Sequence, residues 1–154
     1  MDYEKEIYKL LKEIHLQLRI LNLDPSLYRF EPKYSDFPVT ISAGNSRKLV
    51  TYKEEGFLTL FNVTCSSKDT EIIMYLDDNK IEGKPSSIFE ESMMSYNPRS
   101  FWLSKYDEEN NKYTVWFTPS PFIHYYERLH IIIEAPENED VTYTYKLYRY
   151  VKRR

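Results

Sequence analysis

His124 and His130 are the residues of this sequence best suited to metal or acid–base chemistry, and they stand six positions apart. Tyr125, Tyr126 and Glu127 lie between them. Imidazole nitrogens and a carboxylate can ligate zinc, or act as a base and the group that orients it. This spacing crosses a predicted strand turn and matches no common metal-binding motif. We therefore predict structural or interfacial roles and no metal site, which leaves a metal-dependent enzyme as the third interpretation.

The single cysteine and one acidic turn are the other candidates for chemistry. Cys65 follows Phe61 and Val63 at alternate positions, which predicts a buried side chain in a strand rather than a nucleophile. Residues 77–79, Asp-Asp-Asn, offer oxygen ligands of the kind that calcium prefers, but they lack the alternating ligands and distant Glu of a calcium loop. A hairpin turn explains them, because Asp and Asn tolerate turn dihedrals. We predict that the protein is not an enzyme and needs no cofactor.

Aromatic residues are the unusual feature of the composition. Tyr (15), Phe (8) and Trp (2) together make 16% of the chain. Aromatic rings on a strand can stack on sugar rings, or they can pack across strands to hold the sheet together, and both arrangements have the same sequence pattern. The candidate ligand-binding residues, which we place in neighbouring strands, are Trp102, Trp116, Tyr125 and Tyr126. They favour an alternative function as a carbohydrate- or receptor-binding module, with core packing as the competing interpretation.

The elements that must position these residues are predicted to be β-strands. Residues 48–82 alternate apolar and polar side chains over two long stretches, separated by the polar residues 66–69. Turn signals continue at near-regular spacing to residue 151 with no long helix between them; Ser87 and Glu90 form a capping box that predicts one or two helical turns. We predict an all-β fold with an N-terminal α-helix, in which residues 39–154 form an antiparallel, jelly-roll-like β-sandwich of about eight or nine strands.

Residues 1–24 are predicted to form the one long helix. Its apolar residues follow a four-three spacing that is typical of a coiled coil: Ile7, Leu11, Ile14, Leu18 and Leu21. Asp24 precedes Pro25, which ends the helix. The stripe either docks on the protein's own sheet or pairs with copies of itself.

Residues 25–38 are predicted to form an aromatic connector arm with no steady period. Tyr28 and Phe30 are among its expected anchors, either on the surface of its own domain or on that of a neighbour. The helix and the arm are therefore the predicted oligomerisation elements.

Residues 53–84 carry a resemblance to a known class of proteins. The stretch beginning Gly56-Phe-Leu-Thr-Leu-Phe, the polar residues 64–70 and the segment Glu-Ile-Ile-Met-Tyr-Leu-Asp-Asp-Asn-Lys-Ile of residues 71–81 resemble small β-sandwich modules in virion structural proteins of bacteriophages and archaeal viruses. Such modules often have Asp-Gly at the second turn, where this chain has Asp77-Asp78-Asn79. The resemblance implies a tail, collar or capsid-associated protein, and it carries no catalytic residues.

These features together predict a non-enzymatic structural subunit of a homo-oligomeric assembly, a virion protein whose partners are copies of itself and other assembly proteins. The net charge of −3 gives no reason to expect nucleic-acid binding, except through the basic tail formed by Arg149, Lys152, Arg153 and Arg154. The sequence contains no signal-peptide pattern and no apolar run of about twenty residues. We therefore expect synthesis in the cytoplasm, incorporation into a virion and no membrane span.

Overall fold

The computed structural model describes residues 3–21, 26–92, 100–119 and 122–153, in which eleven strands and two helices occur. The predicted all-β class with an N-terminal helix is confirmed, but the expected eight or nine strands were too few. The helices are α1 (Tyr3–Leu21) and α2 (Pro85–Ser92), the latter where the capping box predicted helical turns. The strands are β1 (Tyr28–Tyr34), β2 (Val39–Ile41), β3 (Ser46–Tyr52), β4 (Gly56–Cys65), β5 (Glu71–Leu76), β6 (Asn79–Gly83), β7 (Trp102–Asp107), β8 (Lys112–Phe117), β9 (Ile123–Tyr125), β10 (Leu129–Glu134) and β11 (Val141–Lys152).

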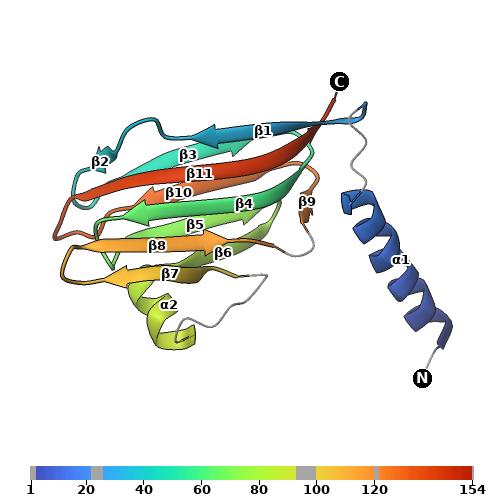
Figure 1. Cartoon of the computed structure of the whole chain (residues 1–154), viewed down its shortest axis with the longest axis horizontal. Helices are drawn as coiled ribbons and strands as arrows, with labels where there is room; N and C mark the ends of the chain where they lie inside the picture. The colour runs from blue at the N-terminus through green and yellow to red at the C-terminus, as the bar shows by residue number, and fades with distance from the viewer. Residues whose placement is uncertain (1–2, 22–25, 93–99, 120–121, 154) are drawn as a thin grey trace.

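The strands form two antiparallel sheets that lie face to face (Figure 1). The seven-stranded sheet has the order β1-β11-β4-β8-β7, with β2 also paired to β11 and β9 also paired to β4. The four-stranded sheet has the order β3-β10-β5-β6. β8 and β9 pair with successive parts of β4, residues 61–65 and 56–58, so they follow one edge of that strand.

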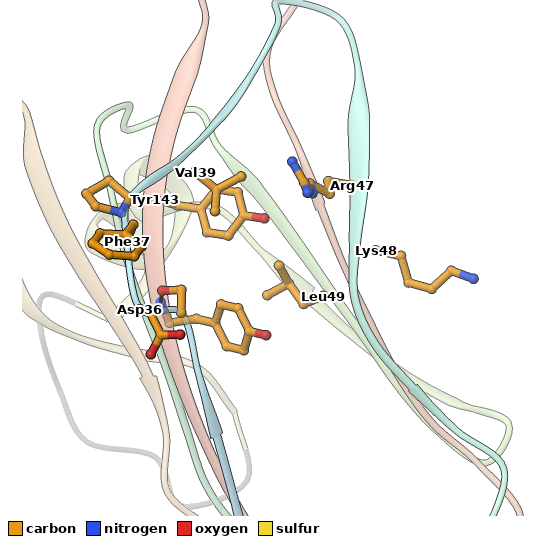
Figure 2. A pocket seen from close by; sticks show the side chains of 10 residues that line it. Asp36, Phe37, Val39, Arg47, Lys48, Leu49 and Tyr143 are labelled. Atoms are coloured by element: carbon orange, nitrogen blue, oxygen red, sulfur yellow. Dashed lines mark hydrogen bonds between the residues drawn. The ribbon is translucent and has the colours of Figure 1, made fainter.

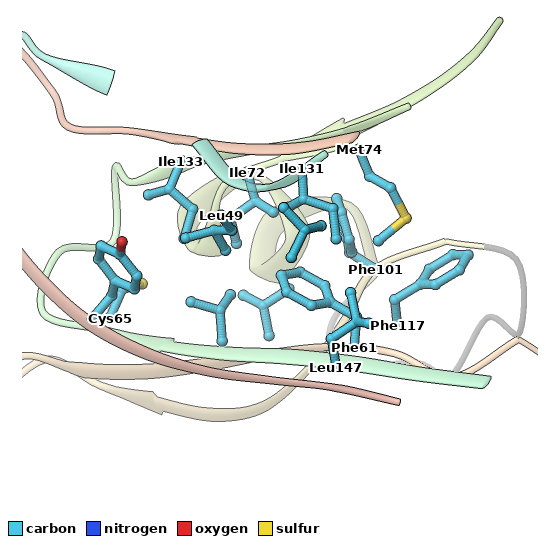
Figure 3. Close-up of a cluster of buried hydrophobic side chains, with 14 of the residues drawn as sticks. Leu49, Phe61, Cys65, Ile72, Met74, Phe101, Phe117, Ile131, Ile133 and Leu147 are labelled. Atoms are coloured by element: carbon cyan, nitrogen blue, oxygen red, sulfur yellow. The ribbon is translucent and has the colours of Figure 1, made fainter. Parts of the chain in front are cut away.

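The core lies between the two sheets, as Figure 3 shows. Phe61, Phe117 and Leu147 enter it from the seven-stranded sheet, and Ile131 and Ile133 enter it from β10 of the other sheet. All five are fully buried. Each such side chain stabilises the fold by about 1.5–3 kcal/mol relative to an exposed one. The period-two patterns of β4, β8, β10 and β11 follow from this, because alternate residues face the core.

β1 corrects the expected domain boundary at residue 39. The segment expected as a connector arm contains a strand that pairs with β11 along its whole length, from Tyr28 opposite Lys152 to Tyr34 opposite Lys146. Its Pro32 is compatible with this position because β1 is at the edge of the sheet. The β domain therefore includes residues before 39, and β1 belongs to it.

Arg149 is the one fully buried cationic side chain among the described residues, with 1% of its surface exposed. It lies on β11, and its guanidinium donates hydrogen bonds to Glu31 of β1, to Glu54 at 2.9 Å and to the Tyr125 hydroxyl at 2.9 Å. The guanidinium also stacks on the Tyr52 ring of β3, 3.2 Å from its centroid. The cluster joins both sheets and fastens the edge strand β1.

The chemistry of this cluster keeps Arg149 charged. Burial alone would lower the pKa of Arg149, but the hydrogen bonds that it donates to Tyr125, Glu31 and Glu54 raise it, so the guanidinium stays protonated. Tyr125 can approach because β4 begins with Gly56, where a Cβ atom would lie 2.5 Å from the Tyr125 hydroxyl oxygen. The sequence predicted Arg149 to be part of a basic C-terminal tail. Because its side chain is buried, Arg149 adds no exposed charge to that tail.

Asp77 connects the two sheets at one end of the molecule. It occupies the β5–β6 turn with a positive φ of 56°, a conformation that Asp adopts more readily than most residues. Its carboxylate accepts hydrogen bonds from the backbone N–H groups of Tyr126, Glu127 and Arg128 at 2.7–3.1 Å. Burial alone would raise the pKa of Asp77, but these three donors lower it. The acidic turn is thus a structural element that holds the β9–β10 connection.

Replacing Asp77 with Asn should lower the free energy of unfolding at neutral pH by about 1.5–3 kcal/mol, because the backbone donors then bond to a neutral acceptor in place of a charged one. The folded pKa of Asp77 lies below that of the unfolded chain. Its contribution is therefore present above about pH 4, the unfolded value, and is lost as the pH falls through the folded value. Urea unfolding of the unmodified and Asp77→Asn proteins should show a difference that shrinks in acid.

The matched control for this experiment is Asp78→Asn, in the same turn but exposed. It should change stability by less than about 0.5 kcal/mol. A stability difference for Asp77→Asn that is the same at neutral and acidic pH would contradict the role assigned to the carboxylate.

Replacing Arg149 with Ala should destabilise the protein by about 3 kcal/mol, because Glu31, Glu54 and Tyr125 lose their shared partner. Urea unfolding measures the effect, with Lys152→Ala as control, since Lys152 is a largely exposed cation on the same strand. Equal effects of the two substitutions would show that the buried cluster does not stabilise the fold.

Candidate functional site

The apolar stripe of α1 is exposed over the part whose side chains the structure describes, residues 3–14. Ile7 and Leu11 each expose 58% of their surface, and Ile14 exposes 44%. The helix stands beside the sheets rather than on either of their faces (Figure 1). The structure therefore does not bury this part of the stripe against its own domain. Leu18 and Leu21 belong to α1, but their side chains lie outside the described set. Neither described helix combines the length and apolar character needed to cross a bilayer.

The two predicted arm contacts have different environments. Tyr28 is 9% exposed and meets Phe57 of its own domain edge-on, with ring centroids 5.6 Å apart, so it is not available to a neighbour. Phe30 is 50% exposed and packs against Tyr148 and Tyr150 of β11. Of the two, only Phe30 retains surface for contact with another molecule.

Trp102 and Trp116 are brought together. They stand directly opposite each other on β7 and β8, and their rings stack with centroids 5.8 Å apart and planes 17° apart. The Trp102 Nε1–H donates to Thr118 Oγ1 at 2.9 Å, and the Trp116 Nε1–H donates to Ser104 Oγ at 2.7 Å. Both indole N–H groups are therefore engaged, and the orientation of each ring is fixed.

Tyr125 and Tyr126 do not join the tryptophan pair. Tyr125 is fully buried and its hydroxyl accepts the hydrogen bond from Arg149; burial raises its pKa. Tyr126 is 69% exposed in the β9–β10 connection, where its ring meets the ring of His124 at a centroid distance of 4.1 Å. The four aromatic residues predicted as one ligand site thus occupy three separate environments.

The tryptophan pair instead belongs to a row that crosses the outer face of the seven-stranded sheet. Directly opposed residues on five adjacent strands form it, in the order Trp102, Trp116, Asn62, Lys146 and Tyr34. A second row beside it contains Thr114, Thr64 and Thr144, and the first two hydroxyls are 3.0 Å apart. Between Trp116 and Tyr34 the surface is hollowed by a concavity of about 270 Å³, which we call the outer-face trough.

The sequence identified only one wall of this trough. Trp116 was a candidate, whereas Asn62, Lys146 and Tyr34 were not. The outward orientation of Asn62 could be predicted, because Asn62 alternates with the buried residues Phe61 and Val63 and must face the opposite side of β4. Nothing local to Tyr34 or Lys146 indicates that they lie on adjacent strands.

The two C-terminal histidines are separated by the fold. His124 is on β9 of the seven-stranded sheet, where its Nε2 is 2.7 Å from a Glu55 carboxylate oxygen and its ring stacks on Phe57. His130 is on β10 of the other sheet, where its Nδ1 is 2.7 Å from Thr51 Oγ1 and burial lowers its pKa. Within the described parts of the chain, no group of three or more His, Cys, Asp or Glu side chains is arranged to hold a metal ion.

A second hollow, of about 370 Å³, opens at the edge where the segment before β2 faces β3 (Figure 2). Phe37 and Asp36 lie on one side of it and Arg47 on the other, with Tyr143 between the two sheets. Burial raises the pKa of Tyr143, so its hydroxyl is protonated at neutral pH. The polar side chains that line this edge pocket include Ser35, Asp36, Arg47 and Lys48.

Comparisons of the sequence with protein families and with curated proteins find no match.

Cys65 should be unreactive in the folded protein. It is 2% exposed, and burial raises the pKa of its thiol to about 11, despite hydrogen bonds that oppose the shift. A pKa about two units above that of an exposed thiol reduces the reactive thiolate by about a hundredfold near neutral pH. A chromogenic disulfide reagent should label the native chain at least that much more slowly than the unfolded chain. Equal labelling rates would show that Cys65 is accessible.

Proposed function

We propose that this chain is a non-enzymatic structural subunit of a homo-oligomeric assembly, and that copies associate through α1. The observation that carries the proposal is the exposed apolar stripe of α1, in which Ile7, Leu11 and Ile14 face solvent while the β domain beside them has a complete core of its own. Stripes of this size are normally covered in the functional state of a protein.

A second copy of the same helix is the best-supported cover. The stripe repeats with heptad spacing, so two identical helices can interlock their apolar residues along one seam. Each Leu or Ile that becomes buried contributes about 1.5–3 kcal/mol. Most of the stability of a helix in a protein comes from packing of its apolar face, which makes association the natural source of stability for α1. Glu4 and Glu6 in the first turn favour the helix by facing the positive end of its dipole.

The strand pairing supports a jelly-roll arrangement for the β domain. The ladders are nested: β1 pairs with β11, β3 with β10, β4 with β8 and β9, and β5 with β6. Consecutive pairs of this nested set fall alternately in the two sheets, as they do when one long hairpin is rolled into two layers. β2 and β7 are additions to this pattern. Jelly rolls are common in viral capsid proteins, which, with the resemblance of residues 53–84, favours a virion as the assembly.

The test is the oligomeric state of the full-length chain with Leu11 replaced by Asp. Size-exclusion chromatography with light scattering should show an oligomer for the unmodified protein and a monomer for Leu11→Asp, because a carboxylate in the seam cannot be desolvated without a partner. Thermal unfolding of the β domain should be unchanged, since Leu11 makes no part of its core.

The control is Lys9→Asp, which places the same residue on the same helix but about 160° away from Leu11. It should remain oligomeric. An unmodified protein that is monomeric, or an oligomer that survives Leu11→Asp, contradicts the proposal.

A further inference from the structure

We propose that the outer-face trough binds a short oligosaccharide, with sugar rings against Trp116 and Tyr34 and sugar hydroxyls on the polar floor between them. This binding site goes beyond the proposed role in assembly and does not depend on α1. It rests on the pairing register of five strands and on the chemistry of the residues that this register places together.

The trough has aromatic walls at a separation suited to more than one sugar ring. Trp116 is on β8 and Tyr34 is on β1, and β4 and β11 lie between these strands. Three strand spacings of about 4.8 Å place the two walls about 14 Å apart, which accommodates two or three linked sugar units. Tyr34 exposes 58% of its surface, and Trp116 lines the concavity.

The orientation of the Trp116 wall is set before any ligand arrives. Its ring is stacked on Trp102, and its Nε1–H is already bonded to Ser104. The ring face is therefore what Trp116 can offer to a ligand. A sugar presents apolar C–H groups on one face of its ring, and these pack on an aromatic face in the way that other apolar groups do. A fixed ring also loses little conformational entropy on binding.

The floor supplies the hydrogen bonds that sugar hydroxyls require. Each hydroxyl both donates and accepts, and so do the side chains of Asn and Thr. Asn62, Thr64, Thr114 and Thr144 line the concavity from three adjacent strands. Lys146 is the single charged residue among those described as lining it, so a neutral sugar is accommodated and a carboxylate-bearing sugar gains an ion pair.

This distribution of polarity favours a glycan over a protein partner. Protein interfaces have an apolar centre surrounded by a polar rim, whereas the trough has a polar centre with aromatic residues at its ends. It also disfavours a nucleic acid, whose phosphates require several cations. One lysine in the trough of a chain with net charge −3 does not provide them.

The experiment is binding of the labelled full-length protein to an immobilised array of glucans, galactans, xylans, mannans and sialylated glycans, followed by calorimetric titration with the strongest ligand. Trp116→Ala should weaken binding by about tenfold or more, and Tyr34→Ala by about fivefold, because each removes one stacking wall. Tyr34→Ala leaves the core intact, so it remains informative if Trp116→Ala fails to fold. Tyr126→Ala is the matched control, an exposed aromatic outside the trough, and should bind normally.

The expected result is saturable binding to at least one oligosaccharide class that both trough substitutions weaken. A change in tryptophan fluorescence on titration, absent in Trp116→Ala, would place the sugar at this wall. The proposal is overturned if no glycan on the array binds, if binding is unchanged by Tyr34→Ala and by Trp116→Ala, or if a single-stranded oligonucleotide binds through these residues where no glycan does.

Discussion

The register of β11 decides the character of both faces of the seven-stranded sheet. This strand of 12 residues pairs with β1 and β2 on one side and with β4 on the other. In that register Leu147 enters the core, while Lys146 faces outward beside Asn62 and Tyr34. A slip by one residue would exchange the two faces, burying lysine and exposing leucine. The burial of β11's apolar residues therefore fixes the outward row as well as the core.

Arg149 adds a polar constraint to this register. A buried guanidinium is costly to desolvate, and the cost is offset only where all of its partners are in place. Those partners come from β1, from the β3–β4 connection and from β9, with the Tyr52 ring of β3 stacked against it. The observed arrangement of these segments brings all of the partners to the charge. The same contacts hold β1 on the sheet, and β1 in turn carries Tyr34, so the cluster positions one wall of the trough from a distance.

The sequence predicted best what depends on neighbours along the chain. Alternation identified β4 and β5 and the burial of Cys65, and the turn at Asp77 was expected. Ser87 and Glu90 indicated the region of α2, although the helix begins at Pro85 and Ser87 lies inside it, where its hydroxyl accepts a hydrogen bond from the Lys84 N–H. Strand β1 was not predicted, because an edge strand that contains a proline and lacks strict alternation has no local sequence signature. Arg149 was read as part of a basic tail, since sequence does not reveal partners more than ninety residues away, such as Glu31 and Glu54.

The outer-face trough could not be predicted from the sequence for the same reason. Its row joins residues 34, 62, 116 and 146, and their proximity exists only once the strands are paired. Likewise, Tyr125 and Tyr126 are adjacent in sequence, but alternation sends one into the core and leaves the other exposed. The high aromatic content suggested an aromatic ligand-binding surface, but it did not indicate which residues would form that surface.

We propose that the stripe of α1 is covered by another copy of the chain. Sedimentation equilibrium of the unmodified full-length protein over a wide concentration range tests this most directly, because it needs no substitution and reports mass independently of shape. We expect a defined oligomer that dissociates only on dilution. A single-chain mass at every concentration would contradict it.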